Sequence, residues 1–248
     1  MPRFSQLFLL LACLIGCAWS CTTTADEPAN ATSKHAPGTT KGMIDIERFE
    51  RPDDATQLVG QDKHTLVPEK GEKTNWTFAD GVLTAPTGWD SLVTPDAYND
   101  FVMHVEFNVN DKGGDNREAD GNSGVYIQQR YEIQIQNAHG IPEDEFTTSY
   151  NGSIYRLKKP DRLVSKPAGQ WQTYDIVFRA ARFDGEKKTE NARITVYHNG
   201  VLIHDDYELP RKTGAGKKEG PEPMPIKLQG HNNPVKFRNV WIKALELD

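Results

Sequence analysis

A run of alternating apolar and polar side chains from Val125 to Gln136 constrains the fold of this 248-residue chain more than any other stretch. Successive side chains of a β-strand point to opposite faces, so the run predicts one strand with an apolar and a polar face. The apolar face holds Val125, Ile127, Tyr131, Ile133 and Ile135, and Gln129 is the one polar residue in that phase. The polar face holds Tyr126, Gln128, Arg130, Glu132, Gln134 and Gln136. Such a row of amides with one Arg and one Glu is either a solvated sheet face or a surface that hydrogen-bonds a polyhydroxylated ligand.

Short alternating segments separated by turn residues recur along the rest of the chain. Asp80-Gly81 and Asn199-Gly200 are typical two-residue hairpin turns between such segments. The segment 101–109 also alternates, and it places His104 and Glu106 together on its polar side. No ten-residue stretch carries the apolar stripe of an amphipathic helix. We therefore expect an all-β fold, an antiparallel two-sheet β-sandwich of the jelly-roll type.

The first 21 residues have the anatomy of an export signal, with a short basic start and an apolar run too brief to span a bilayer comfortably. The run ends in Leu-Ile-Gly-Cys17, which resembles a bacterial lipobox, whereas cleavage near Ala25 or lipidation of Cys21 are alternatives. Residues 22–42 are polar and predict a flexible tether, and residues 43–248 predict a single β-sandwich domain. The chain is thus expected in the periplasm or cell envelope, touching the membrane only through a lipid anchor at Cys17.

Composition excludes several classes of function. All three cysteines, Cys13, Cys17 and Cys21, lie in the leader, so the folded part has no disulfide, thiol nucleophile or thiolate metal site. The formal charge of −6 argues against binding a polyanion through bulk charge. The basic loop 210–225 contains no interleaved aromatic residues, so we interpret it as a solvated loop and expect no nucleic acid partner.

The outward faces of three predicted strands carry the candidate site residues. If these strands share one sheet, their outward faces form a polar surface of the kind on which sandwich proteins hold sugars. The candidate residues on that surface are His104, Glu106, Arg130, Glu132, Gln134, Gln229 and His231. An ordinary glycosidase needs two carboxyl groups about 5–10 Å apart. The neighbours of Glu132 two positions away are Arg130 and Gln134, so its own strand offers one carboxylate only. His104, Glu132 and His231 are also candidate ligands of a divalent metal.

Several motifs appear in an order that resembles one known family. They are Asn122-Ser-Gly-Val-Tyr, Tyr131-Glu-Ile-Gln-Ile, Gly152-Ser-Ile-Tyr, Lys166-Pro-Ala-Gly-Gln-Trp, Asn199-Gly, Leu228-Gln-Gly-His and Val235-Lys-Phe-Arg-Asn-Val-Trp-Ile. Together they resemble the 3-keto-disaccharide hydrolase family over roughly residues 43–248. The resemblance implies a concanavalin-like (lectin-like) jelly roll, export in bacteria, and action on glycosides whose sugar ring carries a ketone at carbon 3.

The resemblance also implies roles for the candidate residues. A ketone at carbon 3 acidifies the hydrogen on carbon 2, so a base can remove it and the group on carbon 1 can leave, after which water adds. Glu132 and His231 would then be base, acid or metal ligand, and Arg130, Gln134, Gln229, His104 and Glu106 would bind the substrate. A divalent metal is a candidate for stabilising the enolate. His231 is followed by Asn232, where a glycine is more usual. The alternatives are a non-catalytic carbohydrate-binding module and an anchored interaction domain without a ligand.

Overall fold

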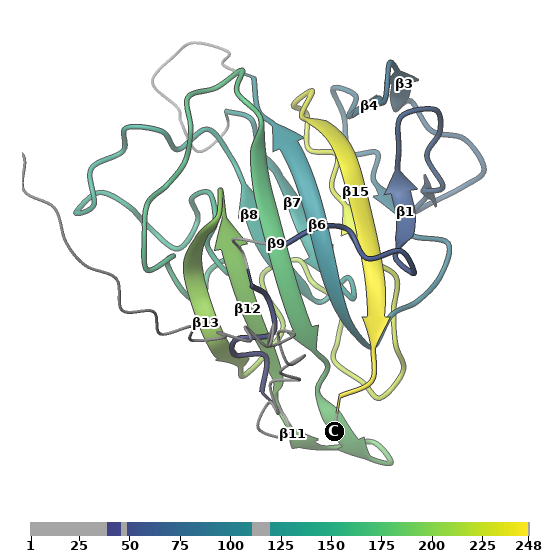
Figure 1. The fold of residues 1–248 in the computed structure, drawn as a ribbon, viewed down its shortest axis with the longest axis vertical. Helices are drawn as coiled ribbons and strands as arrows, with labels where there is room; N and C mark the ends of the chain where they lie inside the picture. The colour runs from purple at the N-terminus through teal and green to yellow at the C-terminus, as the bar shows by residue number, and fades with distance from the viewer. Residues whose placement is uncertain (1–38, 46–48, 111–119, 248) are drawn as a thin grey trace, which may run out of the picture. The chain divides into compact units, whose positions relative to one another are not determined.

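The structure, a computed structural model, describes residues 39–45, 49–110 and 120–247, which lie in one compact unit, His35–Asp248. The described residues form an all-β jelly roll of antiparallel strands and contain no helix. The expected fold class is confirmed. Among these residues there is accordingly no helix long and apolar enough to cross a membrane. The larger sheet lies in front in Figure 1, and strands of the smaller sheet lie behind it.

The larger sheet has eight strands in the order β13-β12-β9-β6-β15-β4-β3, and β1 pairs with β15 off this path. Their bounds are β1 Thr56–Val59, β3 Thr77–Ala79, β4 Val82–Thr84, β6 Asp100–Asn108, β9 Gln172–Arg179, β12 Ala192–His198, β13 Val201–Leu209 and β15 Lys236–Leu245. The Asp80-Gly81 and Asn199-Gly200 turns connect β3 to β4 and β12 to β13, as their sequence predicts. Both Asp80 and Asn199 have the positive φ that such turns require, 52° in each case.

The smaller sheet has five strands in the order β2-β5-β14-β7-β8. Their bounds are β2 Val67–Pro68, β5 Leu92–Val93, β7 Ser123–Ile127, β8 Tyr131–Ile135 and β14 Lys227–Leu228. A separate hairpin pairs β10, Arg182–Asp184, with β11, Lys187–Glu190. The facing sides of the two sheets enclose the main core. That core includes Phe101, Met103, Val105 and Phe107 of β6 together with Val125, Ile127, Ile133 and Leu228 of the smaller sheet.

The run Val125–Gln136 is a hairpin, so the prediction of one continuous strand is wrong. Ile127 pairs with Tyr131, and Gln128, Gln129 and Arg130 form the connecting loop. Gln128 and Gln129 have φ values of 49° and 53°, in the left-handed region that tight turns use. Paired residues share a face and the loop has three residues, so the alternation stays in phase across the turn. The predicted apolar and polar faces of the two strands are therefore correct, although the backbone is a hairpin and not one strand.

The basic loop 210–225 is bound to this turn through its main chain. Thr213 N donates to Arg130 O at 3.0 Å, and Lys217 N donates to Gln129 O at 2.8 Å. The Arg130 side chain donates from Nε to Lys218 O at 3.2 Å and from Nη2 to Glu222 O at 3.0 Å. The four basic side chains of the loop are exposed, as expected for a solvated loop. Its backbone, however, is fixed to the hairpin.

The predicted tether, residues 22–42, includes residues that pack in the folded domain. Thr40 is fully buried, its backbone N donates to Asp206 Oδ1 at 2.8 Å, and its hydroxyl lies 2.8 Å from that of Thr195. Residues around Thr40 therefore belong to the folded unit, because the hydroxyl of Thr40 satisfies groups on β12 and β13. The predicted leader 1–21, with its lipobox at Cys17, and most of the tether lie outside the described residues.

Candidate active site

The outward face of the smaller sheet gathers polar side chains from three strands. Tyr126 of β7 pairs with both Glu132 of β8 and Lys227 of β14, so these three side chains form one row. Gly124 pairs with Gln134, and Gln229 N donates to Gly124 O at 3.0 Å, which forms a second, adjacent row. We call this group, Tyr126, Glu132, Gln134, Lys227 and Gln229, the polar platform. Of the predicted site residues, it contains Glu132, Gln134 and Gln229.

The Glu132 carboxyl is enclosed, with 3% of the residue exposed. Burial raises its pKa to about 7, against a hydrogen bond with Tyr126 and the charges of Lys227 and Arg156, which lower it. A carboxyl with a pKa near neutrality can both accept and return a proton. Its Oε2 atom is buried and has no hydrogen-bond partner among the described residues. Glu132 is therefore the only carboxyl group among the five residues of the polar platform, and its pKa suits proton transfer.

Gly124 makes room for this carboxyl. A Cβ atom at residue 124 would lie 2.6 Å from Glu132 Oε1 and 3.0 Å from its Cγ. Real Cβ atoms do not approach other atoms so closely, so any larger residue would displace the Glu132 side chain. The glycine of the Asn122-Ser-Gly-Val-Tyr motif thus has a steric role in the platform.

Tyr126 and Lys227 surround Glu132 with a hydroxyl and a cation. Lys227 Nζ lies 4.1 Å from the centre of the Tyr126 ring and 3.5 Å from Glu69 Oε1. Burial, and then the charge of Glu132, raise the pKa of Tyr126 well above its ordinary value of 10. The hydroxyl is therefore protonated at any physiological pH and can donate. The sequence places Tyr126 on the polar face of the alternating run, but neither Tyr126 nor Lys227 is among the predicted site residues.

Two amides extend the platform. Gln134 Nε2 donates to Asn122 Oδ1 at 3.1 Å, and Gln229 Nε2 donates to the Tyr126 hydroxyl at 3.4 Å. The Oε1 atoms of both amides are buried without a hydrogen-bond partner among the described residues. Buried acceptors without partners are costly, at about 1–3 kcal/mol each. Three such acceptors on one face, counting Glu132 Oε2, fit a ligand that brings several hydroxyl donors.

His231 lies at the edge of the same sheet, beyond the end of β14. Its ring centre is 3.9 Å from that of Trp89, whose side chain is exposed at 74% relative accessibility. Asn232 N donates to Gly88 O at 3.0 Å, which holds the two segments together. Asn232 has a φ of 56°, and asparagine tolerates this left-handed conformation better than most residues. The asparagine thus adopts a backbone conformation that a glycine would also take, and the departure from the family pattern leaves the turn intact.

His104 and Glu106 do not join the polar platform, and this part of the prediction is wrong. Both lie on β6 of the larger sheet and point outward, because the intervening Val105 points into the core between the sheets. His104 Nδ1 lies 2.5 Å from Asp175 Oδ1. Burial disfavours the charge on His104, but hydrogen bonds with Asp175 and Glu106 outweigh it and raise its pKa to about 9.

Arg130 is a structural residue of the hairpin loop. Its Nη1 donates to Gln128 Oε1 at 2.9 Å, and its other donors hold the 210–225 loop. The guanidinium is thereby committed to acceptors of the protein itself. The prediction that Arg130 orients the substrate from the strand fails because the residue is not in a strand.

The three predicted metal ligands do not converge. His104 lies on the larger sheet, whereas Glu132 and His231 belong to the smaller one. Within the described residues there is no group of three or more His, Cys, Asp or Glu side chains that could hold a metal ion. The residues present therefore do not fit a metal centre built on these three side chains.

Comparison with known proteins decides the family. A family model described as a 3-keto-alpha-glucoside-1,2-lyase-like domain matches residues 59–243. The chain belongs to this family. The resemblance found in the sequence motifs is thus confirmed, and the match covers every residue of the polar platform.

Solved structures support the same assignment. A "putative glycosyl hydrolase" from Parabacteroides distasonis ATCC 8503 is 30% identical, with 79% of this chain and 86% of that chain covered and a TM-score of 0.71. A second structure of that description from the same organism is 23% identical, covers 78% of this chain and 100% of its own, and has a TM-score of 0.54. At that identity the second structure supports the fold alone. No curated protein matches the chain significantly.

Proposed function

We propose that this chain cleaves the glycosidic bond of 3-keto-glycosides at the polar platform. The observation that carries the proposal is the single buried carboxyl of Glu132, with a pKa of about 7 and an unpartnered Oε2. Removal of a proton from carbon 2, next to a ketone, needs one base and not a pair of carboxylates. The membership of the chain in the 3-keto-alpha-glucoside-1,2-lyase-like family agrees with this chemistry.

In the first step, the Glu132 carboxylate takes the proton from carbon 2. The electrons of that C–H bond form the enolate of carbons 2 and 3, with negative charge on the ketone oxygen. The Lys227 ammonium and the Tyr126 hydroxyl are the cation and the donor beside Glu132, and they stabilise this charge. The amides of Gln134 and Gln229 accept hydrogen bonds from the sugar hydroxyls and fix the ring.

In the second step, the enolate re-forms the ketone and a double bond forms between carbons 1 and 2. The bond from carbon 1 to the aglycone oxygen breaks, and that oxygen takes a proton from an acid, for which Tyr126 and the rim residue His231 are the candidates. Water then adds its hydroxyl to carbon 1 and gives its remaining proton to the acid, which is thereby restored, and carbon 2 recovers a proton from Glu132. The net reaction is hydrolysis, and Glu132 ends in its starting state.

The test is release of a chromogenic aglycone from a 3-keto-glucoside by the full chain. We expect turnover by the wild type and loss of about 10²–10⁴-fold in kcat/KM for Glu132→Gln, the range that one general base contributes. Glu186→Gln is the matched control, because Glu186 is an exposed carboxylate in the β10–β11 turn. No release by the wild type, or equal rates in the wild type and Glu132→Gln, would refute the proposal.

A non-catalytic carbohydrate-binding module is the second candidate. The observation in its favour is the exposed Trp89 ring beside His231, since exposed aromatic rings stack on sugars. This candidate predicts that the wild type and Glu132→Gln bind a 3-keto-glucoside equally and that neither releases the aglycone. The same assay, combined with calorimetric titration, separates the two candidates.

Export and lipid anchoring at Cys17 remain part of the proposal. The supporting observation is the leader that ends in Leu-Ile-Gly-Cys17. Metabolic labelling with a radioactive fatty acid tests it, because Cys17→Ala should lose the label whereas Cys21→Ala should keep it. The opposite pattern would assign the anchor to Cys21, and no label in the wild type would favour plain cleavage.

A further inference from the structure

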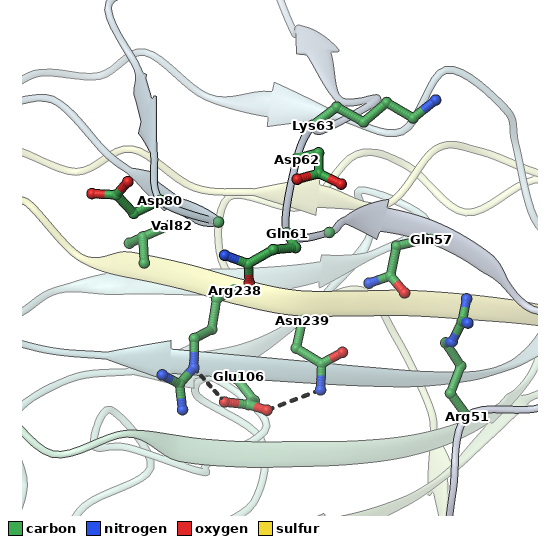
Figure 2. A pocket seen from close by; sticks show the side chains of 12 residues that line it. Arg51, Gln57, Gln61, Asp62, Lys63, Asp80, Val82, Glu106, Arg238 and Asn239 are labelled. Atoms are coloured by element: carbon green, nitrogen blue, oxygen red, sulfur yellow. Dashed lines mark hydrogen bonds and ion pairs between the residues drawn. The ribbon is translucent and has the colours of Figure 1, made fainter.

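A cavity of about 600 Å³ opens on the outer face of the larger sheet, away from the polar platform. Figure 2 shows its walls, which are the segment around Gln57 and Gln61, the turn at Asp80 and the part of β15 that carries Arg238 and Asn239. Glu106 lies at its base. The volume is within the range of about 300–1,000 Å³ found for small-ligand sites. Glu106, one of the residues expected at the catalytic site, thus lines a different cavity.

Two irregularities of the larger sheet lie at this cavity. The register of β15 shifts between Arg238 and Trp241, and that of β1 shifts between Gln57 and Val59. Asn239, inside the first shift, has a φ of 43°. β-Bulges re-aim side chains and are frequent beside functional sites. Arg238 is the cross-strand partner of Glu106, and the bulge that follows it turns Asn239 toward the same carboxylate.

Four polar side chains of the cavity are held by hydrogen bonds within the protein. Arg238 Nε donates to Glu106 Oε2 at 2.7 Å, and its guanidinium carbon lies 4.0 Å from the centre of the Trp171 ring. Asn239 Nδ2 donates to Glu106 Oε1 at 2.9 Å. Gln57 Nε2 donates to the backbone oxygens of Val59 and Val240 at 2.7 and 3.1 Å, so the amide presents its Oε1 as acceptor. Side chains already fixed in this way lose little conformational entropy on binding.

The charge of the lining favours a neutral ligand. The lining contains three cations, Arg51, Lys63 and Arg238, and three carboxylates, Asp62, Asp80 and Glu106. An anion would meet as many carboxylates as cations, and the lining contains no trio of metal ligands among the described residues. The amides of Gln57, Gln61 and Asn239 supply both donors and acceptors. A lining of this kind suits a polar ligand that also carries both, unlike the apolar lining of most drug-sized sites.

We infer that this cavity is a second, non-catalytic binding site, and that its ligand is a neutral oligosaccharide. The site lies on the larger sheet, and the proposed catalytic Glu132 lies on the smaller one. A glycan held there leaves the polar platform accessible. The inference does not depend on the ketone chemistry, because an oligosaccharide without a ketone should bind equally well.

The test is titration of the isotopically labelled full chain with a panel of neutral gluco-, manno- and xylo-oligosaccharides that carry no ketone. Proton–nitrogen NMR spectra follow the backbone amides of Gly60 and Gly81, which line the cavity. We expect saturable shifts at both glycines with at least one oligosaccharide. Inorganic phosphate and calcium, titrated separately, should leave them unchanged.

Two variants remove cavity amides. Gln61→Ala removes the Gln61 amide from one wall of the cavity. Asn239→Gly removes the Asn239 amide from another wall, and glycine tolerates the positive φ at that position. We expect each to weaken binding about tenfold or more, which corresponds to the loss of one well-made polar contact. Gln170→Ala, an exposed amide before β9, is the matched control and should bind as the wild type does.

The outcomes separate this inference from the proposed function. Turnover of a 3-keto-glucoside should be unchanged in Gln61→Ala and Asn239→Gly, and a failure of turnover in the wild type would not affect the NMR readout. The inference is overturned if no oligosaccharide shifts Gly60 and Gly81, or if both variants bind as tightly as the control. Shifts with phosphate or calcium but not with sugars would also overturn it, in favour of an ion site.

Discussion

Replacing Glu132 by glutamine should make the protein more stable at alkaline pH while removing its activity. The pKa of Glu132 is about 7 in the folded protein, against an ordinary value of 4.5. At 1.36 kcal/mol per pH unit, this difference corresponds to about 3 kcal/mol that the fold loses when the carboxyl ionises. The sign follows from proton binding, because between pH 4.5 and about 7 the folded state holds a proton that the unfolded state has released.

The wild type is therefore expected to lose stability as the pH rises through this window. Below pH 4.5 both states are protonated at this residue and the penalty is absent, and above about pH 7 the penalty is complete. Glutamine cannot ionise and has nearly the same shape. The gain in Glu132→Gln should be close to zero near pH 4.5 and should approach 3 kcal/mol, or about 6–12 °C in Tm for a domain of this size, at about pH 8.

The assay is urea unfolding of the wild type, Glu132→Gln and the exposed control Glu186→Gln at about pH 5 and about pH 8. Glu186→Gln should track the wild type at both values. If Glu132→Gln gains the same increment at both pH values, the gain does not come from ionisation. If it gains nothing at about pH 8, the carboxyl is not destabilised by burial, and the argument for its raised pKa and for its role as a base fails.

Three further predictions follow from the same geometry. Gly124→Ala should displace the Glu132 carboxyl and lower kcat/KM on the order of 10²-fold, as misplacement of a catalytic group by about 1 Å does. Activity at the wild-type level would contradict the steric role of Gly124. Tyr126→Phe should lower kcat by about 10²-fold or more while leaving urea unfolding of the domain intact, and an unchanged kcat would remove the hydroxyl from the mechanism. His104 should titrate by NMR near pH 9, and Asp175→Asn should lower that pKa. Asp175→Asn should not change aglycone release, because His104 and Asp175 lie on the larger sheet; a loss of activity would show that this pair contributes to the catalytic site.

The sequence predicts the fold class and which side chains of the run from Val125 to Gln136 share a face, because both depend on local alternation. Tyr126, Glu132 and Gln134 were assigned to one face, and the pairing of β7 with β8 places them there. The alternation could not reveal the turn at residues 128–130, since a three-residue loop preserves its phase. Glycine and proline, the usual turn signals, are absent from that loop, and Gln128 and Gln129 adopt positive φ instead.

The assignment of His104 and Glu106 to the catalytic site could not be checked from sequence. Every strand of a sandwich has one outward face, and alternation does not tell which of the two sheets a strand joins. The pairing of β6 with β9 and β15 decides it, and that pairing joins residues at least 65 positions apart. For the same reason the cavity at Glu106 is invisible in the sequence, because Gln57, Asp80 and Arg238 come from distant segments.

The attachment of the 210–225 loop to Arg130 has a consequence for how relatives of this protein can diverge. The acceptors for the guanidinium are backbone oxygens, at Lys218 and Glu222, and these exist whatever side chains the loop carries. A Cβ at Gly216 would lie 2.0 Å from Arg130 O, so one position must also stay small. Two side chains of the loop also reach the domain, because Thr213 Oγ1 accepts from Glu132 N at 2.8 Å and Glu219 Oε1 accepts from the Tyr131 hydroxyl at 2.5 Å. The other positions of the loop can therefore vary in composition, whereas its length can hardly change. Grafting a relative's loop onto this scaffold should succeed when the spacing, the threonine and the glutamate are kept.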